Sequence, residues 1–282
     1  MQTVREPSAV QRLCQSLRDA GKTIGFVPTM GFLHEGHLSL MRRARAENAV
    51  LVISIFVNPT QFGQGEDFDS YPRDLQADLL GLEKVGADLV FAPSAESIYP
   101  VDHRTFVEVA EITEGLCGAS RPGHFRGVAT VVTKLFNLVR PHRAYLGQKD
   151  YQQSVVVRRL AADLNFNLEI VVVPTIREPD GLAMSSRNAR LSPDQRRAAP
   201  VLYRSLMHSQ ERVRGGERRA KIILDEMRAM IDDEPLARVD YIAACDPETL
   251  KPVDTIRGPT LVALAVRFGS TRLIDNILIQ VA

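Results

Sequence analysis

Two histidines stand three residues apart in the segment Pro28-Thr29-Met30-Gly31-Phe32-Leu33-His34-Glu35-Gly36-His37. This segment follows an apolar run typical of a buried strand, and it opens a predicted helix. In an open α/β sheet, ligands bind beyond the carboxyl ends of the strands, where a helix N-terminus offers unpaired N–H groups to phosphate. His34 and His37 share one face of the first helical turn, and Gly36 leaves the backbone open to a flat base or a phosphate. The segment therefore predicts an anion-binding site.

Two other interpretations of the histidine pair stay open. A zinc-binding helix needs histidines at i and i+4 and a third ligand, whereas His34 and His37 are three apart with no third ligand nearby in the sequence. Two structural histidines would give the same spacing by chance, but the position after an apolar strand favours the anion site. We therefore predict no metal ligands from the protein, and the glycine fingerprint of dinucleotide folds is absent.

A second segment, Leu146-Gly147-Gln148-Lys149-Asp150-Tyr151-Gln152-Gln153, also joins a predicted strand to a predicted helix. Lys149 would lie at the same sheet edge as the histidines, where an ammonium group can stabilise charge that develops on a phosphoryl group. Asp150 suits a helix N-cap. Taken alone, Lys149 could equally be an ordinary loop lysine.

A third segment, Asp180-Gly181-Leu182-Ala183-Met184-Ser185-Ser186-Arg187-Asn188, places two hydroxyls before a guanidinium. This set can donate to phosphate, and Arg187 can do so bidentately. A plain loop or a helix cap would use the serines equally well. Anion donors on both sides of a predicted domain boundary predict a cleft that closes over a nucleotide.

Strands and helices alternate through the first part of the chain. Strands are expected at about 23–27, 50–57, 88–91, 143–146 and 168–173, with helices at about 6–20, 36–47, 73–85, 123–139 and 151–163. This alternation predicts an α/β fold with a doubly wound, parallel, Rossmann-like sheet. Helices at about 193–213 and 217–231, followed by strands at about 238–244, 260–267 and 271–281, predict a smaller α+β domain. The expected domains are residues 1–175, which would bind the ligands, and residues 176–282, which would act as a lid.

Composition limits the class of protein. The chain has 282 residues, 45% of them hydrophobic, and a formal net charge of +1. It can bury a core, and it offers no general field for a polyanion such as nucleic acid. Cys14, Cys117 and Cys245 form neither a CxxC motif nor a Cys/His cluster, and no apolar run reaches the roughly 18 residues of a membrane span. We expect a soluble, cytoplasmic protein with no nucleic-acid or membrane partner.

Together, the three segments resemble the pantothenate synthetase family, a branch of the nucleotidyltransferase superfamily with a His-x-Gly-His helix start. The stretches Val57-Asn58-Pro59-Thr60-Gln61-Phe62-Gly63, Tyr71-Pro72-Arg73 and Arg121-Pro122-Gly123-His124-Phe125-Arg126-Gly127-Val128 extend the resemblance in order. One departure concerns the superfamily's Met-Ser-Lys-like loop. Ala183 and Ser186 stand where synthetases acting on tRNA place lysines, so charge would have to come from Lys149 and Arg187.

The resemblance implies an ATP-dependent, AMP-forming carbon–nitrogen ligase of pantothenate biosynthesis, on the coenzyme A pathway. Pantoate would attack the α-phosphorus of ATP to give pantoyl adenylate and pyrophosphate. β-Alanine would then attack the acyl carbon and release AMP. The attacking carboxylate is already ionised at neutral pH, so the first step needs positioning and charge stabilisation rather than a general base. ATP is thus a substrate, and Mg²⁺ is expected to bridge its phosphate oxygens.

The resemblance also implies roles for individual residues. The histidines would contact the ATP phosphates, Lys149 would neutralise the α-phosphate in the transition state, and residues 185–187 would hold the departing pyrophosphate. The implied catalytic residues are His34, His37, Lys149, Ser185, Ser186 and Arg187. The ATP-binding set adds Pro28, Thr29, Met30, Gly31, Gly36, Gly147, Asp150 and Met184. The implied substrate-binding residues are Met30, Asn58, Gln61, Phe62, Arg121 and Gln153.

Some of these roles have structural alternatives. Gln61 and Gln153 match the family's pantoate-binding glutamines, and a neutral amide can hold a carboxylate without deactivating it as a nucleophile. Asn58 and Arg121 match family positions near the site, but either could be structural. Asp78 aligns near a family carboxylate of the metal and phosphate environment. It also fits an exposed helix face, and the exposed face is our prediction.

Two other functions stay open. A nucleotidyltransferase that serves a phosphate acceptor would place more cations in the acceptor pocket, and Gln61 and Gln153 argue against it. A non-catalytic nucleotide sensor would bind ATP without needing Lys149. The resemblance further implies a homodimer formed through the N-terminal domain.

Overall fold

The computed structural model describes residues 1–281, which form two compact units. Unit 1 comprises Met1–Ala110, Arg121–Gly147 and Gln153–Pro174. Unit 2 comprises Glu111–Ser120, Gln148–Gln152 and the chain from Thr175 onward. Two short segments that interrupt unit 1 in the sequence therefore belong to unit 2.

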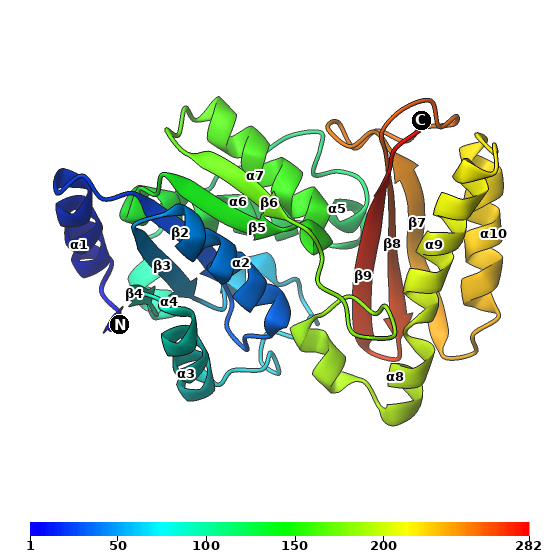
Figure 1. Cartoon of the computed structure of the whole chain (residues 1–282). Helices are drawn as coiled ribbons and strands as arrows, with labels where there is room; N and C mark the ends of the chain where they lie inside the picture. The colour runs from blue at the N-terminus through cyan, green and yellow to red at the C-terminus, as the bar shows by residue number, and fades with distance from the viewer. Residues whose placement is uncertain (282) are drawn as a thin grey trace. The chain divides into compact units, whose positions relative to one another are not determined.

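Within residues 1–281, six strands of unit 1 form one sheet in the order β1-β4-β3-β2-β5-β6 (Figure 1). Every pairing in this sheet is parallel. The strands are β1 (Gln2–Val4), β2 (Ile24–Thr29), β3 (Val50–Ile55), β4 (Leu89–Phe91), β5 (Arg143–Gly147) and β6 (Glu169–Val173). The nearly continuous apolar runs of β2, β3 and β4 suit strands that are covered on both faces. The predicted parallel α/β class is confirmed.

Helices cover both faces of this sheet. Successive residues of a strand point to opposite faces, so neighbouring residues of β2 pack against different helices. Val27 belongs to a core cluster with residues of α2 and α3. Its neighbour Phe26 packs edge-on against Phe136 of α6, with ring centroids 6.4 Å apart. The helices of unit 1 are α1 (Pro7–Asp19), α2 (Glu35–Glu47), α3 (Leu75–Val85), α4 (Ala95–Ile98), α6 (His124–Val139) and most of α7 (Tyr151–Asp163), with a 3-10 turn η1 (Pro59–Gln61). The sheet is therefore doubly wound.

The direction of winding changes between β2 and β5, which are neighbours in the sheet. Their ladder pairs only Gly25 with Arg143 and Phe26 with Ala144, although both strands run further. Pro28, near the end of β2, has no N–H to donate to a ladder. The two strands thus stop pairing before their carboxyl ends. The segments that follow them start at a topological switch point, where α/β folds place ligands.

Unit 2 is built on an antiparallel sheet in the order β7-β8-β9. Its strands are β7 (Ala237–Cys245), β8 (Thr260–Phe268) and β9 (Thr271–Ile279). Its helices are α5 (Cys117–Ser120), α8 (Pro193–Ala198), α9 (Val201–Arg214) and α10 (Ala220–Asp232), with 3-10 turns η2 (Gln148–Asp150) and η3 (Ser186–Arg190). Helices α9 and α10 bury an apolar core with this sheet that includes Leu206, Met227 and Val266. The predicted α+β character of this region is confirmed.

Some elements differ from the sequence-based expectation. The helix expected at about 193–213 is two helices, α8 and α9, and α9 follows Pro200, which cannot donate an N–H within a helix. Three short elements, β1, α4 and α5, were not predicted, because three or four residues show no period. The cysteines at 14, 117 and 245 are free and buried.

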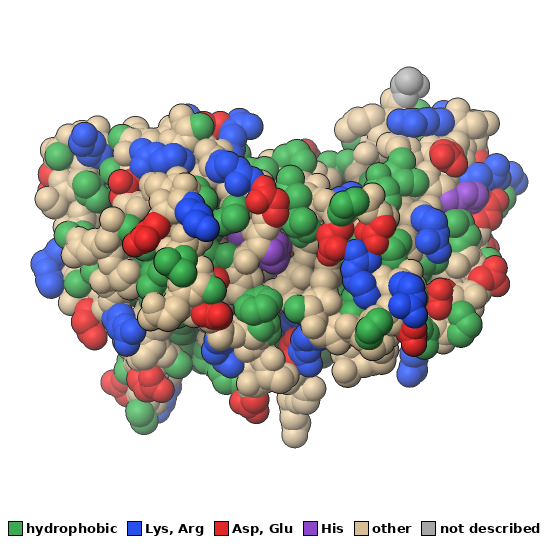
Figure 2. Space-filling model, turned by 60° about the horizontal axis from the view of Figure 1, so that its bottom comes forward, with side chains coloured by type: hydrophobic (Ala, Val, Ile, Leu, Met, Phe, Trp, Pro, Cys, Tyr) green, Lys and Arg blue, Asp and Glu red, His purple; other side chains and the backbone are tan. Residues whose placement is uncertain are grey.

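Acidic and basic side chains are interspersed over the face drawn in Figure 2, and the full sequence has a formal net charge of +1. Within residues 1–281, no helix combines the length and the apolar character that crossing a membrane requires.

Candidate active site

His34 and His37 lie at the start of α2, the helix that follows β2 in the sequence. His34 is the N-cap of α2, and its Nδ1 accepts the Gly36 N–H at 3.1 Å. The His34 N–H donates in turn to Nδ1 of His37 at 3.3 Å, and the two ring centroids lie 4.1 Å apart. Because each Nδ1 accepts a backbone N–H, the proton of each neutral ring lies on Nε2, which is a donor. The helix start thus presents two imidazole donors, the kind of group that binds phosphate oxygens.

The turn before His34 is held by Asp78, whose side chain is only 4% exposed. Its Oδ2 accepts the Phe32 N–H at 2.9 Å and its Oδ1 accepts the Leu33 N–H at 2.7 Å. Burial raises the pKa of this carboxyl, while the two backbone donors oppose the rise. The prediction of an exposed helix face is therefore wrong. Asp78 lies one helical turn before the buried Leu82, so its place on the buried face of α3 was the signal.

This turn also explains Gly31. Gly31 and Phe32 have φ angles of 80° and 51°, in the left-handed region that favours glycine. A Cβ on Gly31 would stand 2.8 Å from Oδ2 of Asp78. Gly31 therefore lets the carboxylate reach the turn. Thr29 stabilises the same place, because its hydroxyl donates to the Ser54 carbonyl at 2.8 Å and accepts the Gly31 N–H at 3.2 Å.

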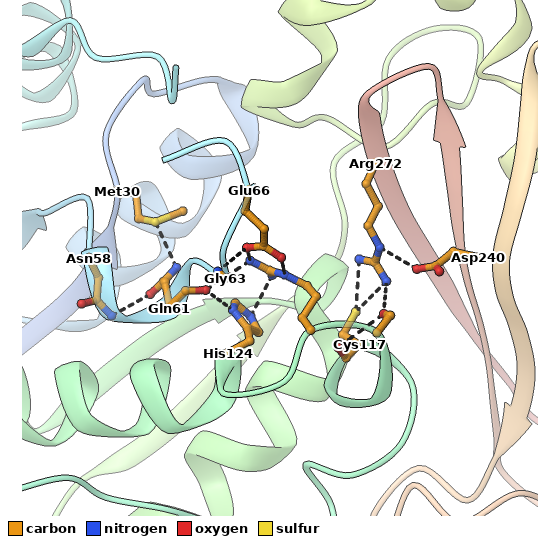
Figure 3. Close-up of polar contacts among 11 residues, drawn as sticks. Met30, Asn58, Gln61, Gly63, Glu66, Cys117, His124, Asp240 and Arg272 are labelled. Atoms are coloured by element: carbon orange, nitrogen blue, oxygen red, sulfur yellow. Dashed lines mark hydrogen bonds and ion pairs between the residues drawn. The ribbon is translucent and has the colours of Figure 1, made fainter. Parts of the chain in front are cut away.

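Three of the predicted pantoate-binding side chains meet in unit 1 (Figure 3). Asn58 is 1% exposed, and its Nδ2 donates to Oε1 of Gln61 at 3.1 Å and to the Gly127 carbonyl at 3.1 Å. The Nε2 of Gln61 lies 3.1 Å from Sδ of Met30. The Oδ1 of Asn58 accepts the hydroxyl of Tyr99 at 2.9 Å. Asn58 thus orients the Gln61 amide, and Met30 links this amide to the turn that precedes the histidines.

The backbone under Gln61 is fixed by a close approach of α6. A Cβ on Gly127 would lie 2.3 Å from the Thr60 carbonyl oxygen and 2.6 Å from the Gln61 nitrogen. Glycine is therefore required at 127 for the helix to touch η1. Phe62, which follows η1, packs its ring against Phe68 and Tyr71 at centroid distances of 5.3 Å and 5.8 Å.

Arg121 is engaged by a carboxylate within unit 1. Its Nε and Nη2 donate to the two carboxylate oxygens of Glu66 at 2.7 Å and 2.6 Å (Figure 3). Its Nη1 lies 3.0 Å from Nε2 of His124, whose Nδ1 lies 2.8 Å from the Gln61 carbonyl. Burial would raise the pKa of Glu66, but hydrogen bonding and charge from Arg121 hold it at about 2. In this arrangement Arg121 fixes the chain around Gln61.

The two glutamines that open α7 differ sharply. Gln152 is 6% exposed, and its amide accepts the Cys117 N–H at 3.0 Å and donates to the carbonyls of Ile112 and Gly115 at 3.0 Å and 2.9 Å. This pattern ties the start of α7 to residues 112–117 and is structural. Gln153, the predicted pantoate ligand, is only partly buried and belongs to unit 1.

Lys149 lies in η2, directly after Gly147 ends β5. Its side chain is 19% exposed, and its Nζ lies 3.6 Å from Oδ1 of Asp150. The Asp150 side chain is 48% exposed, so this pair is weak and leaves the ammonium available to a stronger anion. Lys149 and Asp150 both belong to unit 2.

The serine–arginine segment forms the turn η3 of unit 2. Ser185 is its N-cap, with Oγ accepting the Arg187 N–H at 3.3 Å, and Ser186 is 7% exposed. Met184 precedes the cap and donates its N–H to the Ile176 carbonyl at 3.0 Å. Asn188 ties the turn down, because its Nδ2 donates to Glu178 at 2.8 Å and to the Ala183 carbonyl at 3.1 Å. Both hydroxyls and the guanidinium thus stand on one short, braced turn.

The predicted site residues are thus divided between the two units. The residues in unit 1 are Pro28, Thr29, Met30, Gly31, His34, Gly36, His37, Asn58, Gln61, Phe62, Arg121, Gly147 and Gln153. The residues in unit 2 are Lys149, Asp150, Met184, Ser185, Ser186 and Arg187.

Sequence reasoning missed Asp275 and Asn276 of β9. Asp275 is 3% exposed and pairs with Arg177 at 2.6 Å and 3.0 Å, while Asn276 donates to carbonyls of η2. The signal was a pair of polar residues in the middle of a strand, between the apolar runs 273–274 and 277–279.

Known proteins of one kind match this chain over its length. The family model described as pantoate-beta-alanine ligase matches residues 2–278. The pantothenate synthetase of Moorella thermoacetica is 53% identical over 281 residues, covering 100% of this chain and 99% of the relative. That of Roseiflexus castenholzii is 58% identical over 257 residues, covering 91% and 92%.

Solved structures agree. The crystal structure of pantothenate synthetase from Thermus thermophilus has a TM-score of 0.93 and 48% identity, covering 98% of this chain and 99% of that one. The pantoate-beta-alanine ligase of Francisella tularensis, solved with βγ ATP and β-alanine, has a TM-score of 0.82 and 36% identity, covering 99% and 97%. The motifs, the fold and these matches lead to one assignment, that the chain belongs to the pantoate–beta-alanine ligase family.

Proposed function

We propose that this chain is an ATP-dependent ligase that joins pantoate and β-alanine to form pantothenate, with release of AMP and pyrophosphate. Beyond the family assignment, one observation carries the proposal. The segment after β2 bears Met30, which contacts the Gln61 amide, and four residues later the imidazole pair at the start of α2. The proposed acid-binding amide thus contacts the segment that leads to the proposed phosphate-binding donors.

In the first step, the pantoate carboxylate attacks the α-phosphorus of ATP and pyrophosphate leaves. Gln61 and Gln153 hold pantoate as neutral amides, so the carboxylate keeps its nucleophilicity. The Nε2–H groups of His34 and His37 donate to phosphate oxygens. These contacts position the reactants and oppose the charge that develops during transfer.

The cationic groups of unit 2 complete the proposed machinery. Lys149 stabilises negative charge on the α-phosphate in the transition state, and residues 185–187 hold the departing pyrophosphate. An ammonium suits the first task because it is a compact charge, and a guanidinium suits the second because it binds phosphate bidentately. Asp150 contacts the nucleoside part of ATP. The proposal therefore requires both units to act on the same ATP.

In the second step, the amine of β-alanine attacks the acyl carbon of pantoyl adenylate. The carbon–nitrogen bond forms, the acyl–phosphate bond breaks with AMP leaving, and the amine loses a proton. Among residues 1–281, no group of three or more His, Cys, Asp and Glu side chains could hold a metal ion. We propose that Mg²⁺ enters with the ATP substrate, because this ion usually keeps several waters and binds substrate phosphates rather than a cage of protein ligands.

The location and assembly of the protein are part of the proposal. The three free, buried cysteines suit a reducing cytoplasm. We propose a homodimer formed through the N-terminal domain, and sedimentation of the purified protein would test it. A monomer at micromolar concentration would refute the dimer and leave the reaction unaffected.

Isotope exchange tests the reaction itself. The protein is incubated with ATP, Mg²⁺, pantoate and labelled pyrophosphate, without β-alanine. A ligase that forms pantoyl adenylate returns label to ATP, and the exchange stops when pantoate is omitted. Absence of pantoate-dependent exchange would refute the proposal and leave a nucleotide sensor or another acceptor. Addition of β-alanine should then produce pantothenate and AMP in equal amounts.

A further inference from the structure

The turn that carries Lys149 is fastened to strand β9 by one side chain. Asn276 is 3% exposed, and its Nδ2 donates to the carbonyls of Gln148 and Lys149 at 3.0 Å and 2.9 Å. Both contacts lie within unit 2. A carbonyl can only accept, so the amide nitrogen must face this pair and the orientation of the amide is fixed. Both N–H bonds of the Asn276 side chain are thus used to hold two successive peptide groups.

Asn276 belongs to the face of β9 that points away from α9 and α10. Leu273, Ile277 and Ile279 alternate along the other face and contribute to the helix-covered core. Arg272 lies on the face of Asn276 and reaches Cys117 and Ser120 (Figure 3). This face of β9 is therefore covered by residues 111–120 and η2.

The other polar residue of the pair, Asp275, fastens a different segment. Its carboxylate binds Arg177 bidentately at 2.6 Å and 3.0 Å, and Arg177 also donates to the Gly181 carbonyl at 3.0 Å. The Asn276 N–H donates to Oδ1 of Asp275 at 2.8 Å. Adjacent residues of one strand therefore hold the lysine turn and the start of the loop that leads to Ser185.

The amide of Asn276 carries one cost beside its two hydrogen bonds. Its Oδ1 is buried without a hydrogen-bond partner, and an unsatisfied buried polar atom costs about 1–3 kcal/mol. An apolar residue of similar shape, such as leucine, would avoid this cost in the middle of a strand. A buried amide that leaves one atom unpartnered yet fixes the backbone of the Lys149 turn fits a role in positioning that lysine.

We propose that Asn276 is a positioning residue that sets the conformation of the Lys149 turn for adenylation. The inference rests on the proposed function. Asn276 does not touch the reacting groups, and it acts only through the backbone of residues 148 and 149. Its loss should lower the rate of adenylate formation without weakening ATP or pantoate binding.

The main test uses Asn276→Leu, which keeps the shape of the side chain and removes both donors. In pantoate-dependent pyrophosphate exchange we expect kcat to fall about 10-fold or more, with the KM values for ATP and pantoate within about threefold of wild type. The melting temperature should fall, because the carbonyls of residues 148 and 149 lose their donors, so all rates are measured well below it. An unchanged kcat, or a loss carried by KM alone, would overturn the proposal.

A double-mutant cycle shows whether the effect passes through the lysine. In a Lys149→Ala background, Asn276→Leu should lower kcat by less than about twofold, because the group that it positions is already absent. A loss as large as that in the wild-type background would refute the mechanism. Ile274→Val, on the same face of β9, is the matched control and should leave kcat unchanged.

A second variant and a second readout keep the test decisive. If Asn276→Leu does not fold, Asn276→Ser keeps one donor and should give a smaller loss of kcat. Hydrogen exchange of the unliganded variants should be faster at residues 148–151 than in wild type, and equal protection would count against the proposal. If wild type shows no pantoate-dependent pyrophosphate exchange, the proposed function is refuted. If wild type shows normal pyrophosphate exchange and Asn276→Leu is fully active, only the inference is refuted.

Discussion

The turns that follow β2 and β5 are each anchored by one side chain, which accepts hydrogen bonds in the first turn and donates them in the second. After β2, the Asp78 carboxylate accepts two successive N–H groups, those of Phe32 and Leu33. After β5, the Asn276 amide donates to two successive carbonyls. A carboxylate anchor suits the first turn, because that turn presents two backbone N–H donors to it. A neutral anchor suits the second, because an unpaired carboxylate there would compete with phosphate for the Lys149 ammonium.

The largest expected effect concerns the turn after β5, which carries the Lys149 ammonium. Lys149→Ala should lower the rate of pantoate-dependent exchange by about 10²-fold, equivalent to about 3 kcal/mol, with a modest change in ATP affinity. Single-turnover formation of the adenylate is the direct measurement. Lys84→Ala, a lysine change in α3, should leave the rate unchanged. A loss of less than about threefold at position 149 would remove this lysine from the mechanism.

The next effect concerns the anchor of the first turn. Asp78→Ala leaves two backbone donors without their acceptor, so we expect the free energy of unfolding to fall by about 2–3 kcal/mol in urea titration. Asp78→Asn keeps one acceptor oxygen and should lose less. Asp74→Ala removes the N-cap contact to the Ala77 N–H in the same helix and should cost about 1 kcal/mol without slowing exchange. Equal losses of activity at 74 and 78 would show that Asp78 does not act through the turn.

The neighbouring glutamines of α7 separate binding from structure. Gln153→Ala should raise the KM for pantoate about 10-fold while changing that for ATP far less, because a substrate polar group loses its partner. Gln152→Ala should instead lower thermal stability, since three backbone groups of residues 112–117 lose their contacts. An equal effect of Gln153→Ala on both substrates would contradict its assignment.

The smallest effect is a pH dependence in unit 1. The pKa of Glu66 lies at about 2 in the folded protein, below its ordinary value of 4.5. Ionised Glu66 therefore stabilises the fold above pH 4.5, and this contribution is lost as the pH falls toward about 2. Denaturation of wild type and Glu66→Gln over this range should show the two curves converging with acid.

The buried carboxylate Asp78 should behave in the opposite way. Its pKa is raised above 3.8 by burial, so the folded state binds the proton more readily than the unfolded state does. As the pH falls through this region, wild type should gain stability relative to Asp78→Asn. Parallel curves for both pairs of proteins would show that neither environment is as described.

The sequence was sufficient for the fold because periodicity changes cleanly along it. Apolar runs such as Val50–Ile55 and amphipathic stretches such as Glu35–Glu47 lie within a few residues of their predicted bounds. The failures were local. Strand β1 has only three residues and pairs with β4, a partner far along the chain, so nothing near it reveals it.

Site residues could be predicted from the sequence only where the reactive side chains lie close together in one short segment. The histidine pair and the serine–arginine turn are contiguous, and the structure braces each of them locally. Asp78 and Asn276 act on segments 45 or more residues away in sequence, at separations of 45, 46, 127 and 128. Spacing cannot report such contacts, because only tertiary packing brings a side chain to a distant peptide group.

The contact between Gly127 and η1 has a consequence for inhibition. Because α6 rests on the backbone of Thr60 and Gln61, the amide of Gln61 is ordered when the protein folds rather than when a ligand arrives. If Gln61 binds pantoate as proposed, a compound that mimics pantoate at this amide meets a receptor that loses little further freedom on binding. Resistance through displacement of η1 would require a shift of a whole sixteen-residue helix, which a single substitution seldom achieves without unfolding the sheet beneath it.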